Sequence, residues 1–510
     1  MKQEIDKLLD NINGYPLDEK QRKVVTSNQK YILVSAGAGS GKTLTIIGKI
    51  RYLIEIQKLK ESEILCISFT NEATNNLKNK LKENYNYNIP CYTFHKLGLE
   101  ILKQEEKQIT KTDTLTYIIT EYLNYLISQE DKKRVLTILK IKHNNINYNK
   151  KYKNITPKQL QNLSSLIEKF INLFKANDHK PQEFLNFINK AKTKKEKYFL
   201  VLTYHIYYTY QKELDSKNEI DFQDMISKAT HKIKQKGYNK KIKYIIIDEF
   251  QDTSKVRFNL IKEILNKTNA SLLVVGDDFQ SIYRFTGCDL DLFLKFTTLF
   301  QESKILKIEN TYRNSQELIN IAGSFIMKNQ NQLKKNLKSN KSIKYPLQII
   351  YYKNIINTFI KLITNIHNTT KKPILILGRN NFDINIITKT NKFILTNNTL
   401  IYKDNPNIKM TYLTIHKSKG LEEENIIIIN LTNKKTGFPN KIQDNKILKY
   451  VSCKEDNYKY AEERRLFYVA ITRTKNITYL LTPEKNESIF ITELKKDYKN
   501  KIKIVRNNKF

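Results

Sequence analysis

The stretch YILVSAGAGSGKT (31–43) determines the fold that we expect for this chain. Its apolar, β-branched beginning predicts a buried strand, and Gly37, Gly39 and Gly41 follow that strand directly. A helical stretch begins after Gly41. Backbone N–H groups in such a turn curl around phosphate oxygens, and the helix N-terminus adds a favourable dipole. The order of strand, turn and helix therefore predicts a nucleotide-phosphate loop within an α/β sheet.

Each residue of this loop has an expected role. Lys42 is expected to reach the β- and γ-phosphates, and Thr43 to offer its hydroxyl to Mg²⁺. Ala36 stands where the common pattern has a glycine. The predicted nucleotide contacts are Ala36, Gly37, Ala38, Gly39, Ser40, Gly41, Lys42 and Thr43.

Similar strand signals recur along the chain and indicate parallel α/β sheets. They are ILCISF (64–69), YIIID (244–248), SLLVVG (271–276), ILILG (374–378) and NIIIIN (425–430). Between about residues 100 and 205 they give way to apolar residues at helical spacing, and another strand set begins near Lys304. We therefore expect a first α/β domain at 1–100 and 205–300, a helical insertion at 101–204, and a second α/β domain at 301–510 with a minimal insertion near 325–400.

Two carboxylates follow the strand in YIIIDEFQDTS (244–254). The carboxyl edge of a parallel sheet is where metal and attacking water meet. Asp248 is expected to hold Mg²⁺ through water, and Glu249 to position or deprotonate the hydrolytic water. Acidic residues after a strand also form ordinary turns, so the pair by itself leaves both interpretations open.

The formal net charge of +38 indicates a polyanionic partner such as nucleic acid. A second explanation remains open, because the abundance of Lys, Asn and Ile is typical of an AT-rich genome. No run of 18 or more apolar residues and no signal-peptide pattern occur, so we expect a cytoplasmic protein without a membrane segment. The 4 cysteines are scattered, which argues against a zinc ribbon, an iron–sulfur cluster or a disulfide framework.

Further short motifs occur in one fixed order. They are LDEKQ (17–21), FTNEA (69–73), TFHKL (93–97), IDFQDMI (220–226), GDDFQSIYRFTG (276–287, called motif III below), TYRNS (311–315), TIHKSKGLE (414–422, called motif V below) and EERRLFYVAITRTK (462–475). With the phosphate loop and the acidic box, they resemble the UvrD/Rep/PcrA family of superfamily 1A DNA helicases, and within it the DNA helicase IV group. The resemblance covers nearly the whole chain, although it begins near Leu17, so we expect no counterpart of the helicase IV N-terminal region.

The resemblance implies two RecA-like parallel-sheet motor domains, with ATP and Mg²⁺ as cofactors. It implies that Gln21 reads adenine, that Tyr312 stacks on it and that Glu422 touches the ribose. Gln280 would couple the γ-phosphate to DNA, and Arg313 and Arg473 would reach that phosphate as arginine fingers from the second domain. Lys42, Asp248, Glu249, Gln280, Arg313 and Arg473 are thus the expected catalytic residues.

For DNA, the resemblance implies contacts from several of these motifs. The implied residues are Phe69, Thr70, Asn71, Thr93, His95, Tyr283, Phe285 and His416. Aromatic faces suit single-stranded bases of any sequence. Phe69 and Phe285 can instead be core residues, and His95 and His416 can be ordinary turn or core histidines.

Some positions depart from the family pattern. Leu44 stands where many relatives carry an arginine beside adenine, and Phe285 and Thr286 stand where many have tryptophan and arginine. The segment between Ser315 and Thr414 is too short for the large helical subdomain of long-form relatives, a feature shared with helicase IV.

The expected activity is ATP-dependent 3′→5′ helicase action on single-stranded DNA and its junctions with duplex, in repair, replication or recombination and with proteins of those processes as partners. The polarity comes only from the resemblance. Two other classes remain open: a DNA-stimulated translocase that clears proteins or serves as the motor of a larger complex, and a non-enzymatic nucleic-acid-binding scaffold. The intact Lys42, Asp248, Glu249, Arg313 and Arg473 speak against the scaffold.

Overall fold

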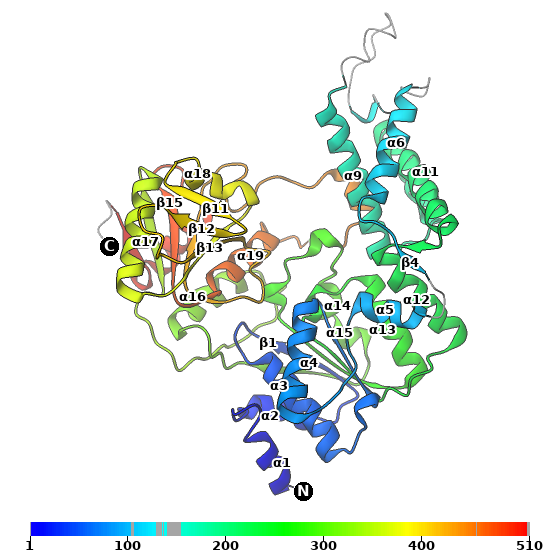
Figure 1. Cartoon of the computed structure of the whole chain (residues 1–510), viewed down its shortest axis with the longest axis horizontal. Helices are drawn as coiled ribbons and strands as arrows, with labels where there is room; N and C mark the ends of the chain where they lie inside the picture. Colours follow the sequence, from blue (N-terminus) through cyan, green and yellow to red (C-terminus); the bar gives the residue numbers. More distant parts are fainter. Residues whose placement is uncertain are drawn as a thin grey trace, which may run out of the picture.

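The computed structural model describes residues 2–103, 107–128, 135, 137–139, 155–454 and 456–506. Figure 1 shows two α/β bodies side by side, with a helical subdomain rising from the first. The predicted α/β class is confirmed. The Asn/Lys-rich stretch 143–154, which the sequence left open as a flexible segment, lies outside the described residues. Within the described ranges, no helix is long and apolar enough to cross a bilayer.

The first sheet has six parallel strands in the order β3-β2-β6-β7-β1-β8. They are β1 (Tyr31–Ala36), β2 (Ile64–Ser68), β3 (Cys91–Thr93), β6 (Tyr244–Ile247), β7 (Ser271–Gly276) and β8 (Ser303–Ile308). Strand β8, near the expected start of the second domain, instead pairs with β1. This corrects the boundary at residue 301, because the first sheet extends to Ile308.

Helices cover both faces of this sheet. One face packs on α1 (Lys2–Leu9), α2 (Glu19–Thr26), α3 (Lys42–Arg51) and α4 (Asn71–Tyr85). The other face packs on α5 (Phe94–Leu102), α12 (Phe222–Lys236), α13 (Lys255–Thr268), α14 (Asp291–Leu294) and α15 (Phe296–Leu299). Alternate residues of β6 serve the two cores: Ile245 and Ile247 face one, and Ile246 faces the other. Burial on both faces explains why these strands read as continuous apolar runs.

Among the described residues, the helical subdomain contains α6 (Thr114–Ser128), α9 (Pro157–Ala176), α10 (Glu183–Asn189) and α11 (Lys194–Ser216). Helix α9 begins with a Thr156–Gln159 capping box followed by Pro157, a strong helix-start signal. The subdomain core extends to Leu214, beyond the expected boundary at 204. A two-stranded ladder of β4 (Gln108–Ile109) and β5 (Glu219–Ile220) lies at its base.

The second sheet has the order β11-β12-β13-β10-β14-β15-β9-β16. Its strands are β9 (Leu347–Tyr352), β10 (Ile374–Gly378), β11 (Phe393–Thr396), β12 (Thr399–Tyr402), β13 (Met410–Thr414), β14 (Glu423–Ile428), β15 (Thr474–Pro483) and β16 (Lys503–Val505). Helices α16 (Gln316–Met327), α19 (Ala461–Ile471) and α20 (Ile489–Tyr498) cover one face, and α17 (Ile355–Thr370) and α18 (Asn385–Thr388) cover the other. Only the pairings of β12 with β11 and with β13 are antiparallel among the described strands.

A buried charge cluster fastens the helical subdomain to the first domain. The Lys175 ammonium on α9 pairs with Asp221 and, at 2.8 Å, with Asp224. Asp221 also caps α12, accepting from the backbone N–H of Asp224 at 2.8 Å. Burial opposes the charge of both carboxylates, and the Lys175 ammonium is the main group that favours it.

We expect Lys175→Met to lower the free energy of unfolding by about 3–5 kcal/mol, because it leaves two carboxylates buried without a cation. Urea unfolding followed by circular dichroism measures the change. Lys212→Met, an exposed lysine on α11, is the matched control and should leave the transition in place. Equal midpoints for the two variants would show that the cluster contributes nothing.

Candidate active site

The phosphate loop has the backbone shape that its glycines predict. Gly39 and Gly41 have positive φ values of 69° and 75°, and α3 begins directly after Gly41. A Cβ atom at Gly39 would lie 2.4 Å from the Cβ of Arg313, so this position also has no space for a side chain. Within the described chain, the buried hydroxyl of Ser40 has no hydrogen-bond partner. The cradle therefore fits a group rich in acceptor oxygens, such as a nucleotide phosphate.

The acidic box lies beside this loop. The Lys42 ammonium is 3.0 Å from Glu249 Oε1. Against the effect of burial, Lys42 and Lys419 lower the pKa of Glu249 to about 2. Burial and the adjacent Glu249 raise the pKa of Asp248 to about 6. Glu249 also has a positive φ of 53°, a strained geometry that places its carboxylate beside Lys42. Hard oxygen donors of this kind suit Mg²⁺, and the assignment of Asp248 and Thr43 to that ion remains a prediction.

The second domain contributes two arginines. Arg473, at the end of α19, is 1% exposed and donates from Nη2 to Gln280 Oε1 at 2.9 Å. Burial lowers its pKa to about 9, and the neighbouring Arg313 adds to the shift. Gln280 in turn donates to Asp277 Oδ2 at 2.6 Å. The structure thus brings Gln280, Arg313 and Arg473 together where the phosphate loop meets the second domain.

Two of the predicted nucleoside contacts are engaged within the protein. Gln21 is buried, and its amide donates to the Ser40 carbonyl at 3.1 Å while accepting from the Asp18 backbone at 2.9 Å. Glu422 accepts from Arg313 Nε at 2.6 Å. Tyr312 is 64% exposed, so its ring face is accessible to a base. The roles predicted for Gln21 and Glu422 toward adenine and ribose remain predictions.

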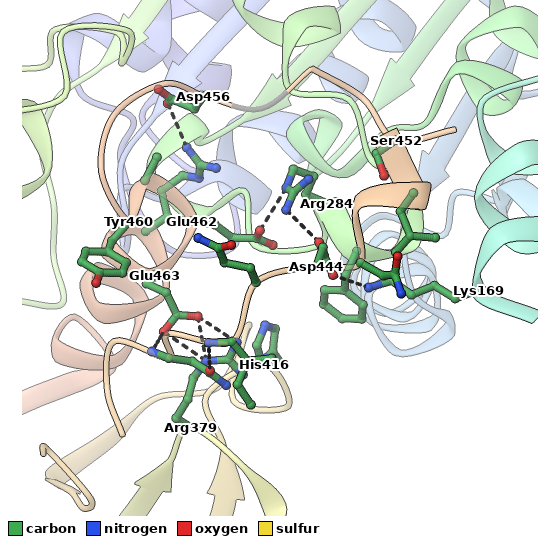
Figure 2. A pocket seen from close by; sticks show the side chains of 18 of the residues that line it. Lys169, Arg284, Arg379, His416, Asp444, Ser452, Asp456, Tyr460, Glu462 and Glu463 are labelled. Carbon is green, nitrogen blue, oxygen red and sulfur yellow. Dashed lines mark hydrogen bonds and ion pairs between the residues drawn. The ribbon is translucent and has the colours of Figure 1, made fainter. Parts of the chain in front are cut away.

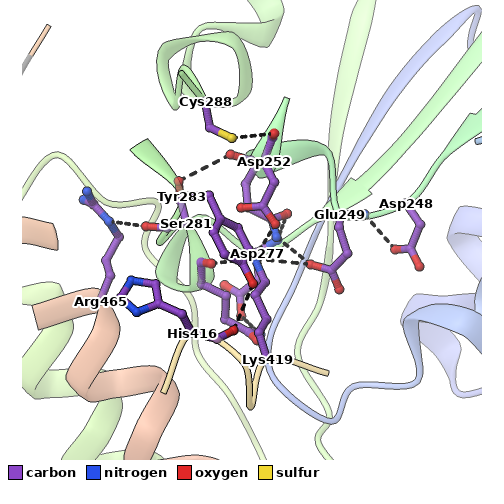
Figure 3. A network of polar contacts seen from close by, with 12 residues as sticks. Asp248, Glu249, Asp252, Asp277, Ser281, Tyr283, Cys288, His416, Lys419 and Arg465 are labelled. Carbon is purple, nitrogen blue, oxygen red and sulfur yellow. Dashed lines mark hydrogen bonds and ion pairs between the residues drawn. The ribbon is translucent and has the colours of Figure 1, made fainter. Parts of the chain in front are cut away.

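Two lysines that were not among the predicted site residues complete the site. Lys419 of the second domain contacts Asp252 and donates to the Gln280 carbonyl at 2.8 Å (Figure 3). Lys335 is buried against Asp277 and, at 2.6 Å, Asp278. Lys419 lies inside the motif TIHKSKGLE (414–422), so the sequence offered a signal that could have identified it. Lys335 lies in a lysine-rich stretch, where nothing in the pattern distinguishes it from its exposed neighbours.

Most of the aromatic candidates meet in one cluster that involves both domains. The rings of Phe69 and Tyr283 are nearly parallel, at 7°, with centroids 6.4 Å apart. Phe285 meets His416 edge-on at 5.4 Å, and the Tyr283 hydroxyl donates to the His416 carbonyl at 2.9 Å. Phe285 is 45% exposed, which rules out the core interpretation for it. Arg257, which the motifs did not predict, lies 4.5 Å over the Phe69 ring.

The remaining candidates lie at helix starts. Thr70 caps α4 and accepts from Ala73 N, Asn71 begins that helix, and Thr93 caps α5. His95 contacts the Phe222 ring at 5.3 Å rather than the main aromatic cluster. Burial, with Arg257, lowers the pKa of His95 to about 4. Burial, with Arg379 and Lys419, lowers that of His416 to about 4, so both imidazoles are neutral at physiological pH.

A cavity of about 1270 Å³ extends from this cluster toward the helical subdomain. Phe285 and His416 line it, together with Arg284 and Arg379 (Figure 2). Arg379 forms a salt bridge with Glu463 in which both its Nε and its Nη2 donate to the carboxylate, with Nη2 2.8 Å from Oε1. The cavity combines aromatic rings with arginines, a combination that suits single-stranded nucleic acid. Its lining also contains the carboxylates Asp444, Asp456, Glu462 and Glu463, which pair with those arginines.

Comparisons with known proteins agree with this geometry. Residues 17–301 match the UvrD/REP helicase N-terminal domain, and residues 385–485 match the UvrD-like helicase C-terminal domain. DNA helicase IV of Escherichia coli is 24% identical, over 95% of this chain and 71% of that protein. ATP-dependent DNA helicase Rep of Buchnera aphidicola is 31% identical, over 70% of this chain. A probable DNA helicase of Mycoplasma pneumoniae is 25% identical, over 91% of this chain and 83% of that protein.

The chain spans 52% of the length of the Rep relative, so the match concerns about half of that protein. The first matched segment covers the first α/β body with its helical subdomain as far as residue 301, and the second covers β11 to β15 of the second body. The two bodies are RecA-like motor domains. The chain belongs to the UvrD/REP helicase family.

Proposed function

We propose that this chain is an ATP-dependent DNA helicase that moves 3′→5′ along single-stranded DNA and separates adjoining duplex. The hydrogen bond between Arg473 and Gln280 carries this proposal, because it joins the second domain to the first beside Lys42 and Glu249. Nucleotide hydrolysis at such a junction changes how the two domains contact each other. Repeated closing and opening of two domains is how a motor of this kind steps along a strand.

Each polar group of the site has a distinct proposed task. The phosphate loop and Lys42 bind the β- and γ-phosphates, and Glu249, kept ionised by Lys42 and Lys419, positions or deprotonates the attacking water. Mg²⁺, held by Thr43 and Asp248, would neutralise charge on the phosphates. Arg313 and Arg473 stabilise the charge of the transferred phosphoryl group from the second domain.

Motif III supports coupling between the nucleotide and DNA. Gln280 at one end of the segment contacts Arg473, and three residues later Tyr283 enters the aromatic cluster. Lys419 holds the Gln280 carbonyl, and the Tyr283 hydroxyl holds the His416 carbonyl, so both ends of this segment are tied to motif V. A shift of Arg473 on hydrolysis would therefore move the side chains that stack on bases.

The proposed substrate is single-stranded DNA and its junctions with duplex. The aromatic cluster supports binding that does not depend on base sequence, and the net charge of +38 supports attraction to a polyanion. The 3′→5′ polarity and a role in repair, replication or recombination follow from the family resemblance alone.

A short duplex with either a 3′ or a 5′ single-stranded tail tests the activity and its polarity together. We expect ATP-dependent separation of the 3′-tailed duplex, no separation of the 5′-tailed one, and none with a non-hydrolysable ATP analogue. Gel separation of fluorescent strands measures this. DNA-stimulated ATP hydrolysis without strand separation would contradict helicase action and favour a translocase that clears proteins.

Lys42→Ala should reduce ATP turnover by about 100-fold or more, because it removes the cation that contacts the transferred phosphate. Binding of a labelled oligonucleotide should remain measurable, since Lys42 lies outside the aromatic cluster. Exposed Lys20 on α2 offers the control Lys20→Ala, which should hydrolyse ATP at the wild-type rate. Undiminished turnover by Lys42→Ala would remove the proposed site.

Arg473→Ala should lower kcat for ATP by about 10³-fold or more, the usual contribution of an arginine finger. Nucleotide affinity should change far less, because the phosphate loop belongs to the other domain. Arg473→Lys tests geometry, since a lysine keeps the charge without the planar fork and should recover little activity. Steady-state ATPase assays measure the change in kcat, and nucleotide-binding titrations of the same variants measure the change in affinity. A change in KM alone would refute the assignment of Arg473 as an arginine finger.

A further inference from the structure

One segment of the second domain crosses to the helical subdomain and returns. Residues 440–454, here called the strap, follow β14 and precede α19, so both ends belong to the second domain. Figure 1 shows this connection passing from the second α/β body to the base of α9 and back. The strap includes the short helix η9 (Lys446–Tyr450).

The middle of the strap is docked into the helical subdomain. Ile447, Leu448 and Val451 are buried within the same hydrophobic cluster as α6, α9 and α11. The Asn177 side chain at the end of α9 donates to the Val451 carbonyl at 2.8 Å. The strap therefore contributes buried apolar side chains to the hydrophobic core of the helical subdomain, so the two are packed together and do not merely pass close to each other.

The strap also forms one wall of the cavity described above. Ile442, Asp444 and Leu448 of the strap line it, and Phe285 and His416 line it from motifs III and V. Single-stranded DNA that stacks on this aromatic cluster therefore lies against the strap. A strand without free ends can pass between the strap and the motor domains only if the strap moves away from the helical subdomain.

The wall carries one carboxylate that holds two cations. Asp444 Oδ1 is 2.7 Å from the Lys169 ammonium on α9, and its Oδ2 is 3.2 Å from Arg284 Nη2 in motif III. Figure 2 shows Asp444 between these two side chains. Arg284 also pairs with Glu462, but Glu462 is on helix α19, whereas Asp444 is on the strap. Although burial opposes its charge, Lys169 and Arg284 lower the pKa of Asp444, which keeps it ionised.

We propose that the strap is a lid over single-stranded DNA and that Asp444 is its latch, occupying the place of a DNA phosphate. The proposal rests on the function proposed above and names a regulation of the same site. Like the carboxylate, a backbone phosphate offers Lys169 and Arg284 one negative charge and two acceptor oxygens. DNA entering the cavity therefore displaces Asp444, and the strap opens to admit the strand.

Replacing the latch tests the competition. Asp444→Asn removes the charge and keeps the size, so we expect about 3- to 10-fold tighter binding of a fluorescein-labelled oligothymidylate, measured by anisotropy at low salt. Asp404→Asn, an exposed carboxylate far from the cavity in the loop after β12, should match wild type. Unchanged or weaker binding by a folded Asp444→Asn protein would overturn the latch.

A reversible lock tests the opening. The Cys453 thiol donates to Asn177 Oδ1 at 2.9 Å, so Asn177→Cys places two sulfurs side by side across the contact of the strap with α9. Diamide takes two electrons and two protons from the pair, and a disulfide forms. We expect the oxidised variant to lose at least 10-fold in affinity for circular single-stranded DNA, and dithiothreitol to restore it. Wild type treated with diamide is the control.

These outcomes separate the two proposals. Equal binding of the circle by locked and reduced protein would overturn the lid while leaving the helicase proposal intact. Absence of DNA binding and of ATP hydrolysis in wild type itself would overturn both. A locked protein that still binds linear oligonucleotides, but not circles, supports the lid, since a free end can thread beneath a closed strap.

Discussion

The hydrogen bond from Arg473 to Gln280 is the contact on which the rest of this structure depends. A guanidinium buried to this degree normally pairs with a carboxylate, because an unpaired charge is costly to desolvate. Here its described partners are neutral oxygens: the Gln280 amide and the backbone carbonyls of Val469 and Leu421. The site therefore holds a cation whose charge is only partly compensated, and an anionic phosphate is the group that would compensate it.

The surrounding charges keep this arrangement stable before a phosphate arrives. Lys42 pairs with Glu249, Lys419 with Asp252, and Lys335 with Asp277 and Asp278. Lys419 and Lys335 come from the second half of the chain, so it supplies the cations that pair with Asp252, Asp277 and Asp278. The charged groups that we propose to bind the nucleotide therefore also hold the two domains together.

The sequence predicted much of this because the relevant signals are local. A strand, a glycine turn and a helix are adjacent in the chain, and a fully buried parallel strand has a distinctive apolar run. The partner of β8 could not be read this way, since pairing with β1 depends on a contact nearly the whole domain away. Lys335 and the strap were missed for the same reason: their partners lie far away in sequence, and lysine-rich composition hides an isolated buried lysine.

The docked strap has a consequence for how the chain is built during synthesis. The core of the helical subdomain includes Ile447, Leu448 and Val451, yet its own helices end at Ser216. A ribosome completes those helices long before it makes the residues that fill their remaining apolar gap. The subdomain therefore emerges with a hydrophobic notch exposed, and its last core residues arrive only once most of the second domain has been made.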